Sequence, residues 1–346
     1  MLEDNYFTKE YIFNKIPIRF MLTERCNLRC HMCSADGLGI GKVNCNQSKE
    51  MNLEKAKILV DLLSEINYSG EITFSGGEPM VYPYFYELIE YILKNNRNTV
   101  KVITNGTIPF KENFFTDRKK AQISIHSLDY KSWNKITQGN IIQFNNLVKN
   151  LEKMNKEQVH NINVVIHKGI NDSNEELFSL FEFSKNNNFH LRLFKLFPYT
   201  ENMYDKYKEI NKEYLNDLKL KKSPNKVRWH NQDEYSQLER YYFNDNLNQE
   251  IDVASCPCFS GECSSCYKWH FLQITSDFKI KTCLERENYI DLNEAIIKKD
   301  SKLLWEKIIE SRIAIFNHGK ESPPLSNHPF FNCGLNTIQI INNLRH

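Results

Sequence analysis

The sequence of 346 residues lacks the features that would place the chain in a membrane or direct its export. No stretch approaches the roughly 18 consecutive apolar residues that a membrane-spanning helix needs. The first twenty residues begin with acidic side chains and contain no uninterrupted apolar run, so they do not resemble a secretory signal. We therefore predict a cytoplasmic protein with no membrane partner.

The chain also lacks an excess of charge of either sign. Its 45 basic and 43 acidic residues give a formal net charge of +2. Proteins that bind nucleic acid through bulk electrostatics are far more basic, so we expect no nucleic-acid partner. Internal repeats and low-complexity tracts are absent as well. The length and the 41% hydrophobic content suit one large α/β domain with a smaller second domain.

Cysteine is absent from the whole middle of the chain, between Cys45 and Cys256. In the cytoplasm, ten cysteines are more typical of metal ligands or catalytic thiols than of disulfides. Their grouping at the two ends of the sequence indicates two sites. The early group is Cys26, Cys30 and Cys33, with Cys45 interpreted as a bystander; the late group is Cys256, Cys258, Cys263, Cys266, Cys283 and Cys333.

Between these groups, short apolar runs alternate with stretches of helical periodicity. This order predicts parallel strands joined by right-handed crossovers, and hence a partial (β/α)6 TIM-like barrel over residues 14–200. Functional residues are expected at the carboxyl ends of its strands. Residues 201–346 are expected to form a connecting segment of helix and irregular chain, then a cysteine-rich domain with a hairpin and a helix near 292–311. The strands are predicted at 16–22, 71–75, 99–104, 122–127, 161–167 and 190–196, and the helices at 52–67, 84–94, 131–137, 143–155 and 173–186.

The first cysteine motif, Cys26, Cys30 and Cys33, has the spacing CxxxCxxC and follows the first predicted strand. Thiolates are soft ligands that suit iron–sulfur clusters. Three ligands on a cubic cluster leave one iron open for a substrate or cofactor. The alternative is a zinc knuckle, which requires four ligands, and His31 is wedged between two of the cysteines.

Two polar motifs follow the second and third strands. Gly76 and Gly77 in the run SGGEP allow the backbone to approach a ligand closely, although an ordinary turn is the alternative. Thr104, Asn105 and Gly106 end the third strand, where they can line a pocket or simply form a turn.

Together, CNLRCHMC, SGGEP and TNG resemble the motifs of the radical S-adenosylmethionine (SAM) superfamily. The resemblance implies that Cys26, Cys30 and Cys33 bind a catalytic 4Fe–4S cluster whose open iron holds SAM. Reduction by a low-potential donor of the flavodoxin or ferredoxin type would yield a 5′-deoxyadenosyl radical that abstracts hydrogen from a substrate. The implied SAM-binding residues are Met32, Gly76, Gly77, Glu78, Pro79, Thr104, Asn105, Ser124 and Arg192. For Ser124 the alternative is an ordinary polar strand residue, and for Arg192 it is an exposed position.

The late cysteines resemble a second site. Cys263, Cys266 and Cys283 flank a hairpin and are similar to the auxiliary 4Fe–4S signature of the molybdopterin-precursor GTP cyclase (MoaA) family. Cys256, Cys258 or Cys333 can supply a further ligand. The alternative is a zinc ribbon, which normally needs a second CxxC pair.

The chain departs from the MoaA pattern where that family holds a triphosphate. Arg19 is retained, but Glu71, Thr73 and Asn161 stand where basic residues are usual, and Lys268 and His270 replace two arginines. The family's C-terminal pair of glycines is also missing from the ending NNLRH. Because phosphates need positive partners, these changes predict a different substrate.

Three functions remain in view. The first is an enzyme acting on a ribosomally made peptide, although only about fifteen residues precede the first strand and leave no leader-binding domain there. The second is an enzyme acting on a nucleoside, sugar or amino-acid derivative. The third is a non-catalytic zinc or iron–sulfur module, which the intact SGGEP motif argues against.

Overall fold

The computed structural model describes residues 11–12, 16–33, 49–95, 99–196, 212–222, 238–243, 246–254, 271–283 and 288–321, and it is organised around one 12-stranded sheet. Six strands lie side by side in chain order, and each pairs in parallel with the next. They are β1 (Ile18–Met21), β2 (Ile72–Ser75), β3 (Val100–Thr104), β4 (Lys119–Ser124), β5 (Val159–Ile166) and β6 (Leu191–Lys195).

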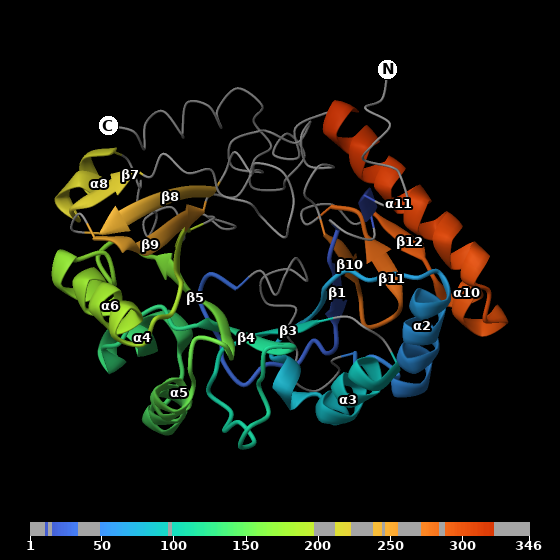
Figure 1. Cartoon of the computed structure of the whole chain (residues 1–346), viewed down its shortest axis with the longest axis horizontal. Coiled ribbons are helices and arrows are strands. Elements are labelled where there is room, and N and C mark those ends of the chain that lie inside the picture. Colours follow the sequence, from blue (N-terminus) through green and yellow to red (C-terminus); the bar gives the residue numbers. More distant parts are fainter. Residues whose placement is uncertain are drawn as a thin grey trace.

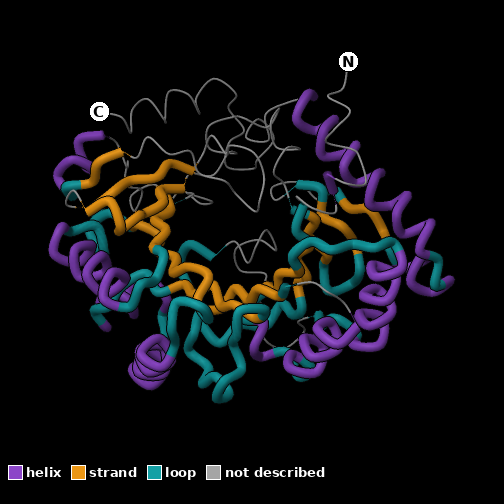
Figure 2. The backbone as a smooth tube through the Cα atoms, in the orientation of Figure 1, coloured by secondary structure: helices purple, strands orange, loops and turns teal. Residues whose placement is uncertain are grey.

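Helices cover the outer side of these strands, which form an arc (Figure 1, Figure 2). The predicted α/β class and partial-barrel fold are therefore confirmed. The covering helices are α2 (Leu53–Glu65), η2 (Pro79–Val81, a single 3₁₀ turn), α3 (Phe85–Asn95), α4 (Tyr130–Thr137), α5 (Ile141–Lys153) and α6 (Asn174–Asn186).

Local sequence signals explain where these helices begin. Asn52, Asp129 and Ser173 each accept a hydrogen bond from a backbone N–H in the first turn of the helix that follows. At the start of α5, Asn140 and Gln143 form a reciprocal capping box. On the outer face of the sheet, Phe20 and Phe74 stack with ring centroids 6.0 Å apart inside the main hydrophobic core.

The connection from β3 to β4, residues 105–118, contains no helix. An aromatic cluster takes its place, because Phe114 packs edge-on against Tyr86 of α3 and against Phe115, at 4.8 and 5.0 Å between ring centroids. This crossover therefore covers the sheet with side chains of a loop.

The sheet continues beyond both ends of the six-stranded arc. At one end β10 (Leu272–Ile274) pairs in parallel with β1, followed by antiparallel β11 (Lys279–Lys281) and β12 (Tyr289–Asp291). At the other end β9 (Asn246–Ala254) pairs in parallel with β6, followed by antiparallel β8 (Leu238–Phe243) and β7 (Leu220–Lys222). The remaining helices are α8 (Lys212–Asp217), α10 (Asn293–Lys298) and α11 (Ser301–Glu321).

Three expectations are corrected. Residues 201–255 are not only helix and irregular chain, since β7, β8 and β9 lie there. The helix near 292–311 is two helices, separated by Lys299 in the left-handed conformation. The fourth strand begins earlier and ends at Ser124, because His126 turns the chain with φ of 58°. The division at residue 200 stays a prediction.

No helix in the described part of the chain is both long and apolar enough to cross a membrane.

Candidate active site

The first cysteine motif lies in the loop that leaves the carboxyl end of β1. Cys26 and Cys30 are half-buried, while Cys33 is exposed. Burial, Glu78 and Cys33 raise the pKa of Cys26 to about 12. The pKa of Cys30 is raised by burial and by Cys33 and Cys26, so the three thiols lie close enough to oppose each other's ionisation. Such thiols become thiolates when a metal neutralises them, which fits a metal-cluster site.

The donor set does not fit a single metal ion. Among the residues that the structure describes, no three His, Cys, Asp or Glu side chains converge on one point as ligands of one ion would. A cubic cluster has a different requirement, because each thiolate binds a separate iron. The chemistry of three thiols in one loop therefore favours a cluster over a mononuclear zinc knuckle.

The SGGEP segment is bonded directly to the chain that leads into the cysteine motif. The N–H groups of Gly77 and Glu78 donate to the carbonyls of Thr23 and Arg25, each at 2.8 Å. A Cβ at Gly76 would lie 2.4 Å from the Thr23 oxygen, and one at Gly77 would lie 2.1 Å from the Arg25 oxygen. The close approach that requires glycine is thus between two loops of the protein; contact with a ligand stays a prediction.

Glu78 is a buried carboxylate at the centre of this edge, 1% exposed. It accepts hydrogen bonds from the Thr104 hydroxyl and the Asn105 N–H, both at 2.8 Å, and from the Met80 N–H at 3.1 Å. Burial nevertheless raises its pKa to about 7, and no lysine or arginine is among the groups that shift it. The site can therefore receive a cationic group such as an ammonium.

Asn105, at the end of β3, ties the cysteine loop to the neighbouring loops. Its amide Nδ2 donates to the Asn27 side chain at 2.8 Å and lies 3.8 Å from the Cys26 sulfur. Its Oδ1 accepts from the Thr107 N–H and hydroxyl, at 2.9 and 2.6 Å. Since its own N–H binds Glu78, one residue positions the thiol, the carboxylate and the loop after β3 together.

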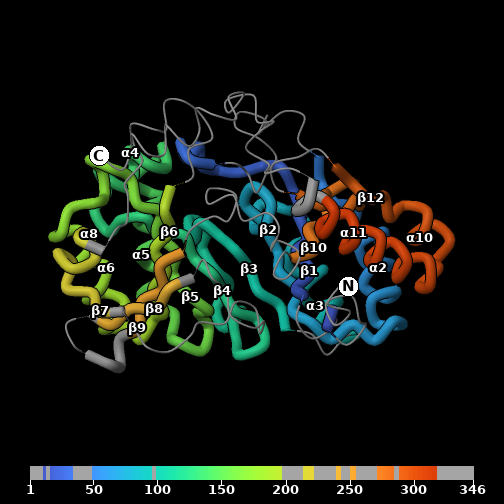
Figure 3. Tube along the Cα trace, turned by 90° about the horizontal axis from the view of Figure 1, so that it is seen from above, coloured from blue at the N-terminus to red at the C-terminus, as the bar shows by residue number. Residues whose placement is uncertain are grey.

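The other side of the cysteine loop rests on the junction of α4 and α5, as Figure 3 shows for the blue segment that follows β1. The Arg29 N–H donates to the Thr137 carbonyl and the His31 N–H to the Ile136 carbonyl, both at 3.0 Å. Gln143 donates to the Asn27 carbonyl at 2.9 Å. The loop is therefore held from β2, β3 and the α4–α5 junction at once.

Inside the arc, the sheet carries an unusual layer of buried polar residues, where barrel interiors are commonly filled with branched apolar side chains. Lys101 of β3 is 2% exposed and pairs with Glu71 at 2.6 Å. It also interacts electrostatically with Arg19 of β1 and Arg192 of β6. These strands are far apart along the sheet, so the side chains meet across the concave interior.

Arg192 belongs to this buried layer. The alternative that Arg192 is exposed is therefore wrong. This arginine is 8% exposed and pairs with Asp252 of β9 at 3.5 Å. Asp252 also contacts His190 at 2.7 Å and Arg240 at 3.0 Å. Although burial alone would raise it, the pKa of Asp252 is held below its usual value by His190, Arg240 and Arg192.

The sequence analysis missed Lys101 and Asp252. A lysine inside the apolar strand TVKVIT was a usable signal, because an unpaired lysine is rarely buried. Asp252 gave no such signal, since its strand is polar along most of its length.

The other predicted site residues fall into two groups. Met32 is half-buried within the cysteine loop, Pro79 opens η2, and Ser124 ends β4 opposite Asn163. Cys283 is half-buried just after β11. The remaining late cysteines and two proposed substrate-site residues lie outside the described residues: Cys256, Cys258, Cys263, Cys266, Cys333, Lys268 and His270.

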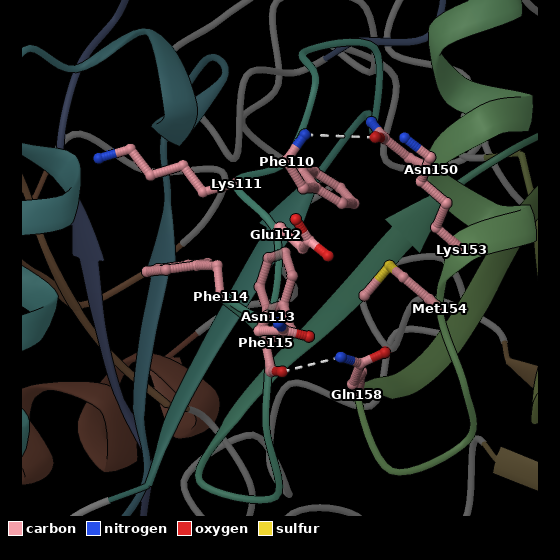
Figure 4. A pocket seen from close by; sticks show the side chains of 10 residues that line it. All are labelled: Phe110, Lys111, Glu112, Asn113, Phe114, Phe115, Asn150, Lys153, Met154 and Gln158. Atoms are coloured by element: carbon pink, nitrogen blue, oxygen red, sulfur yellow. Dashed lines mark hydrogen bonds between the residues drawn. The ribbon is translucent and has the colours of Figure 1, made fainter.

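A cavity of about 430 Å³ lies elsewhere, between the β3–β4 loop and the end of α5 (Figure 4). Phe110, Phe115 and Met154 contribute apolar walls, and the Phe110 N–H donates to Asn150. None of the predicted site residues lines it. The cavity is therefore separate from the cysteine edge.

Comparison with known protein families matches the part of the chain that contains this edge. Residues 20–181 match the model of the Radical SAM superfamily, which includes the cysteine loop, the SGGEP segment and the β3 terminus. These residues are a radical SAM domain, and the chain is a radical SAM enzyme.

Its curated relatives are similar over most of their length. The chain is 24% identical over 308 residues to a probable GTP 3′,8-cyclase of Methanothermobacter thermautotrophicus, covering 86% of this chain and 93% of that protein. It is 27% identical to the GTP 3′,8-cyclase of Clostridium botulinum (strain Langeland), covering 85% and 90%. These are MoaA-type enzymes, as the sequence resemblance implied.

Solved structures share the fold. Streptococcus suis SuiB bound to S-adenosylmethionine superimposes with a TM-score of 0.56 at 14% identity, over 85% of this chain but only 66% of SuiB, just under two thirds. Native anSMEcpe with bound AdoMet has a TM-score of 0.52 at 14% identity, over 95% of this chain and 99% of that one.

Proposed function

We propose that Cys26, Cys30 and Cys33 hold a 4Fe–4S cluster and that the chain cleaves SAM reductively at this edge of the barrel. The observation that carries the proposal is the proximity of three thiols that oppose each other's ionisation to the buried Glu78 carboxylate, with Asn105 bonded to both Cys26 and Glu78. When bound, the cluster and SAM supply a 5′-deoxyadenosyl radical that removes a hydrogen atom from the substrate.

The residues of the chain bind and orient in this scheme. Glu78 receives the SAM ammonium, because it is buried and none of the groups that shift its pKa is basic. Asn105 fixes the Cys26 loop and the base of the adenosine pocket. Met32 packs against adenine, and Ser124 and the SGGEP backbone complete the cofactor site.

The barrel interior supports a substrate other than a nucleoside triphosphate. Lys101 is neutralised by Glu71, and Asp252 lies against Arg192, Arg240 and His190. Cations that already have carboxylate partners are poor ligands for several phosphate charges, since each new contact must replace an existing ion pair.

An amide acceptor in the same interior supports a substrate with N–H or O–H groups. Asn161 is fully buried and donates to Asn163, yet its Oδ1 has no hydrogen-bond partner among the described residues. A substrate group that replaced the atoms covering this oxygen would have to bring an N–H or O–H donor, which a peptide backbone has and a phosphate group lacks. SuiB, whose fold is similar, has been solved bound to its precursor peptide SuiA, at a TM-score of 0.55. We therefore favour a ribosomally made peptide as substrate.

The second candidate is a small molecule bearing hydroxyl or amino groups, such as a sugar, nucleoside or amino-acid derivative. It satisfies Asn161 equally well, and the GTP cyclase relatives act on a small molecule by their names.

We further propose an auxiliary 4Fe–4S cluster near the end of β11, held by Cys263, Cys266 and Cys283 with a ligand from Cys256, Cys258 or Cys333. It would bind substrate through an open iron or carry electrons if fully ligated. Should Cys333→Ala leave the second cluster's spectrum and iron content unchanged, Cys333 is not a ligand.

The test is anaerobic reconstitution followed by iron and sulfide analysis and assay of 5′-deoxyadenosine after addition of SAM and dithionite. The proposal expects about eight irons per chain, and product that is lost when Cys26, Cys30 or Cys33 is changed to Ala. About four irons per chain with the same product would contradict the proposed auxiliary cluster and support the proposed SAM cleavage. Zinc in place of iron, without SAM cleavage, would contradict the proposal.

Asn105→Ala tests the linkage between the loops. It removes the amide contacts to Cys26 and Asn27 but keeps the backbone bond to Glu78. We expect the cluster's midpoint potential to shift, because contacts to a ligating sulfur tune iron–sulfur potentials. Asn146→Ala, which loses one bond to the same loop at the Thr107 carbonyl, is the control and should leave the potential unchanged.

A further inference from the structure

The surface beside the cysteine loop exposes two adjacent isoleucines in the first turn of α5. Ile141 is 46% exposed and Ile142 is 68% exposed. Single exposed apolar residues are ordinary, but a helix normally turns such residues toward its core, as α5 does with Phe144 and Leu147. This pair stands next to the capping-box residue Gln143, whose amide binds the Asn27 carbonyl of the cysteine loop.

Exposed polar residues of the loop adjoin the same surface. His31, between two of the cysteines, is exposed and has its ring 3.4 Å from the Gln138 side chain. Arg29 is exposed, and its guanidinium donates to the Cys26 carbonyl at 2.7 Å. The cysteine loop therefore contacts the chain on either side of the isoleucine pair, at Gln138 and at Gln143.

The residues of α4, and those of α5 up to Leu151, carry charge of one sign. Residues 130–151, which include α4 and most of α5, contain Lys131, Lys135 and Lys149, all exposed, and no Asp or Glu. The carboxylate just before them, Asp129, caps α4 by accepting from the Ser132 N–H. The next one, Glu152, is exposed in the last turn of α5. An apolar centre with a basic surround complements an acidic protein partner.

We propose that the face formed by Arg29, His31, Gln138, Ile141 and Ile142, with its flanking lysines, docks an acidic one-electron carrier protein. The proposal rests on the proposed function and specifies where its electron enters. One electron leaves the carrier, which is oxidised by one unit, and reaches the cluster held by Cys26, Cys30 and Cys33, which is reduced by one unit. No bond or proton has to move, so the requirement on this face is close approach to the cysteine loop.

The experiment compares two ways of reducing the reconstituted holoenzyme. Dithionite is small and needs no docking face, whereas purified flavodoxin, regenerated by its reductase and NADPH, does. Ile142→Glu places a charge of the carrier's own sign at the centre of the face. The matched control is Ile297→Glu, because Ile297 is 71% exposed on α10, which packs on α2 at the other end of the sheet.

We expect Ile142→Glu to raise the flavodoxin concentration needed for half-maximal 5′-deoxyadenosine formation about tenfold, the effect of a central interface residue. The dithionite-driven rate should stay within about twofold of the parent, and Ile297→Glu should match the parent with both reductants. Calorimetric titration of oxidised flavodoxin should show the same order of affinities without turnover. The affinity should also fall as salt is raised.

Equal flavodoxin dependence of Ile142→Glu and Ile297→Glu would overturn the docking face. If Ile142→Glu also lost the dithionite-driven rate, Lys135→Glu would be compared with the parent in its place, since Lys135 is exposed. An unchanged flavodoxin affinity of Lys135→Glu would then overturn the proposal. Failure of the parent to form 5′-deoxyadenosine with dithionite is a different result, since it contradicts the proposed function and not the location of the face.

Discussion

Buried histidines distinguish the carboxyl edge of β4 and β5 at the scale of single residues. His126 is 6% exposed, adopts φ of 58°, and accepts the Val165 N–H at Nδ1. His167, 2% exposed, lies near it. A left-handed conformation at a residue with a ring costs free energy, so it is found where surrounding bonds impose it. Here Asn171 supplies such a bond by donating to the His126 carbonyl at 2.8 Å.

His126 should make the stability of the chain depend on pH. Burial lowers its pKa to about 3, whereas an unfolded histidine titrates near 6.5. Between these values only the unfolded state binds the proton, so the free energy of unfolding should fall by up to about 1.4 kcal/mol per unit as pH decreases. Above pH 6.5 the contribution is constant.

His126→Asn tests this dependence, because asparagine tolerates the left-handed conformation and does not titrate. Urea unfolding at pH 7, 6 and 5 should give a shallower slope for this variant than for the parent. His160→Asn, at an exposed position, should keep the parent's slope. Equal slopes for all three proteins would show that His126 is not held neutral.

At the residue scale, the motifs were readable from the sequence but their partners were not. Cys26 was identified by the spacing of the cysteines, and Glu78 and Asn105 by the resemblance of SGGEP and TNG to the radical SAM motifs. The structure brings the three to one edge. The partners of Arg192 and Lys101 could not be read, because register between distant strands sets them. Gly76 and Gly77 were expected to let the backbone approach a ligand, but the atoms that crowd them in the structure belong to the loop after β1.

At the scale of elements, the contact between the SGGEP and cysteine loops sets the position of the cysteines relative to Glu78. Its backbone bonds fix the distance between the loops, and a side chain at Gly77 would occupy the position of the Arg25 carbonyl. The two loops can therefore meet only if this position carries no Cβ.

Gly77→Ala should separate the two loops. We expect a loss of about 2–3 kcal/mol in stability from the overlap, and a lower iron content after reconstitution. Gly169→Ala is the matched control: a Cβ there meets nothing within 4 Å, and only its φ of +70° opposes the change. The control should lose about 1 kcal/mol and keep its iron. Equal iron content in both variants would contradict the role assigned to Gly77.

Element boundaries followed local signals where these were strong. Helices α5 and α6 begin within about two residues of their predicted starts, because Asn140 and Ser173 cap them. The strands β8 and β9 escaped prediction, since LERYYF and NLNQEIDVA are too polar for a buried-strand pattern. Their pairing with each other and with β6 is a tertiary effect that local sequence does not encode.

At the scale of the whole molecule, Asp252 is the centre of a buried ionic cluster in the sheet interior. Asp252 is 1% exposed and contacts His190, which precedes β6, Arg192 of β6 and Arg240 of β8. Removing one member of a buried ionic cluster leaves the others without compensation, which costs more than the cluster contributes.

Asp252→Asn should therefore destabilise the chain by about 3 kcal/mol. Glu250→Gln is the control, because Glu250 is 30% exposed and, in the part of the chain that the structure describes, forms an ion pair with Arg240 alone; its loss should be at most about 1 kcal/mol. Urea unfolding midpoints at pH 7 measure both. Similar losses for the two variants would show that Asp252 does not organise the interior.

The parallel pairing of Ile18 with Leu272 affects the order in which the sheet forms during synthesis. During synthesis, β1 leaves the ribosome long before its neighbour β10, so this pairing has a very long sequence separation and forms slowly. Until then β1 has a free edge on that side, and the cysteine loop is attached to an unfinished sheet. We expect the nascent chain to offer its three thiols to iron–sulfur assembly proteins before the barrel is complete.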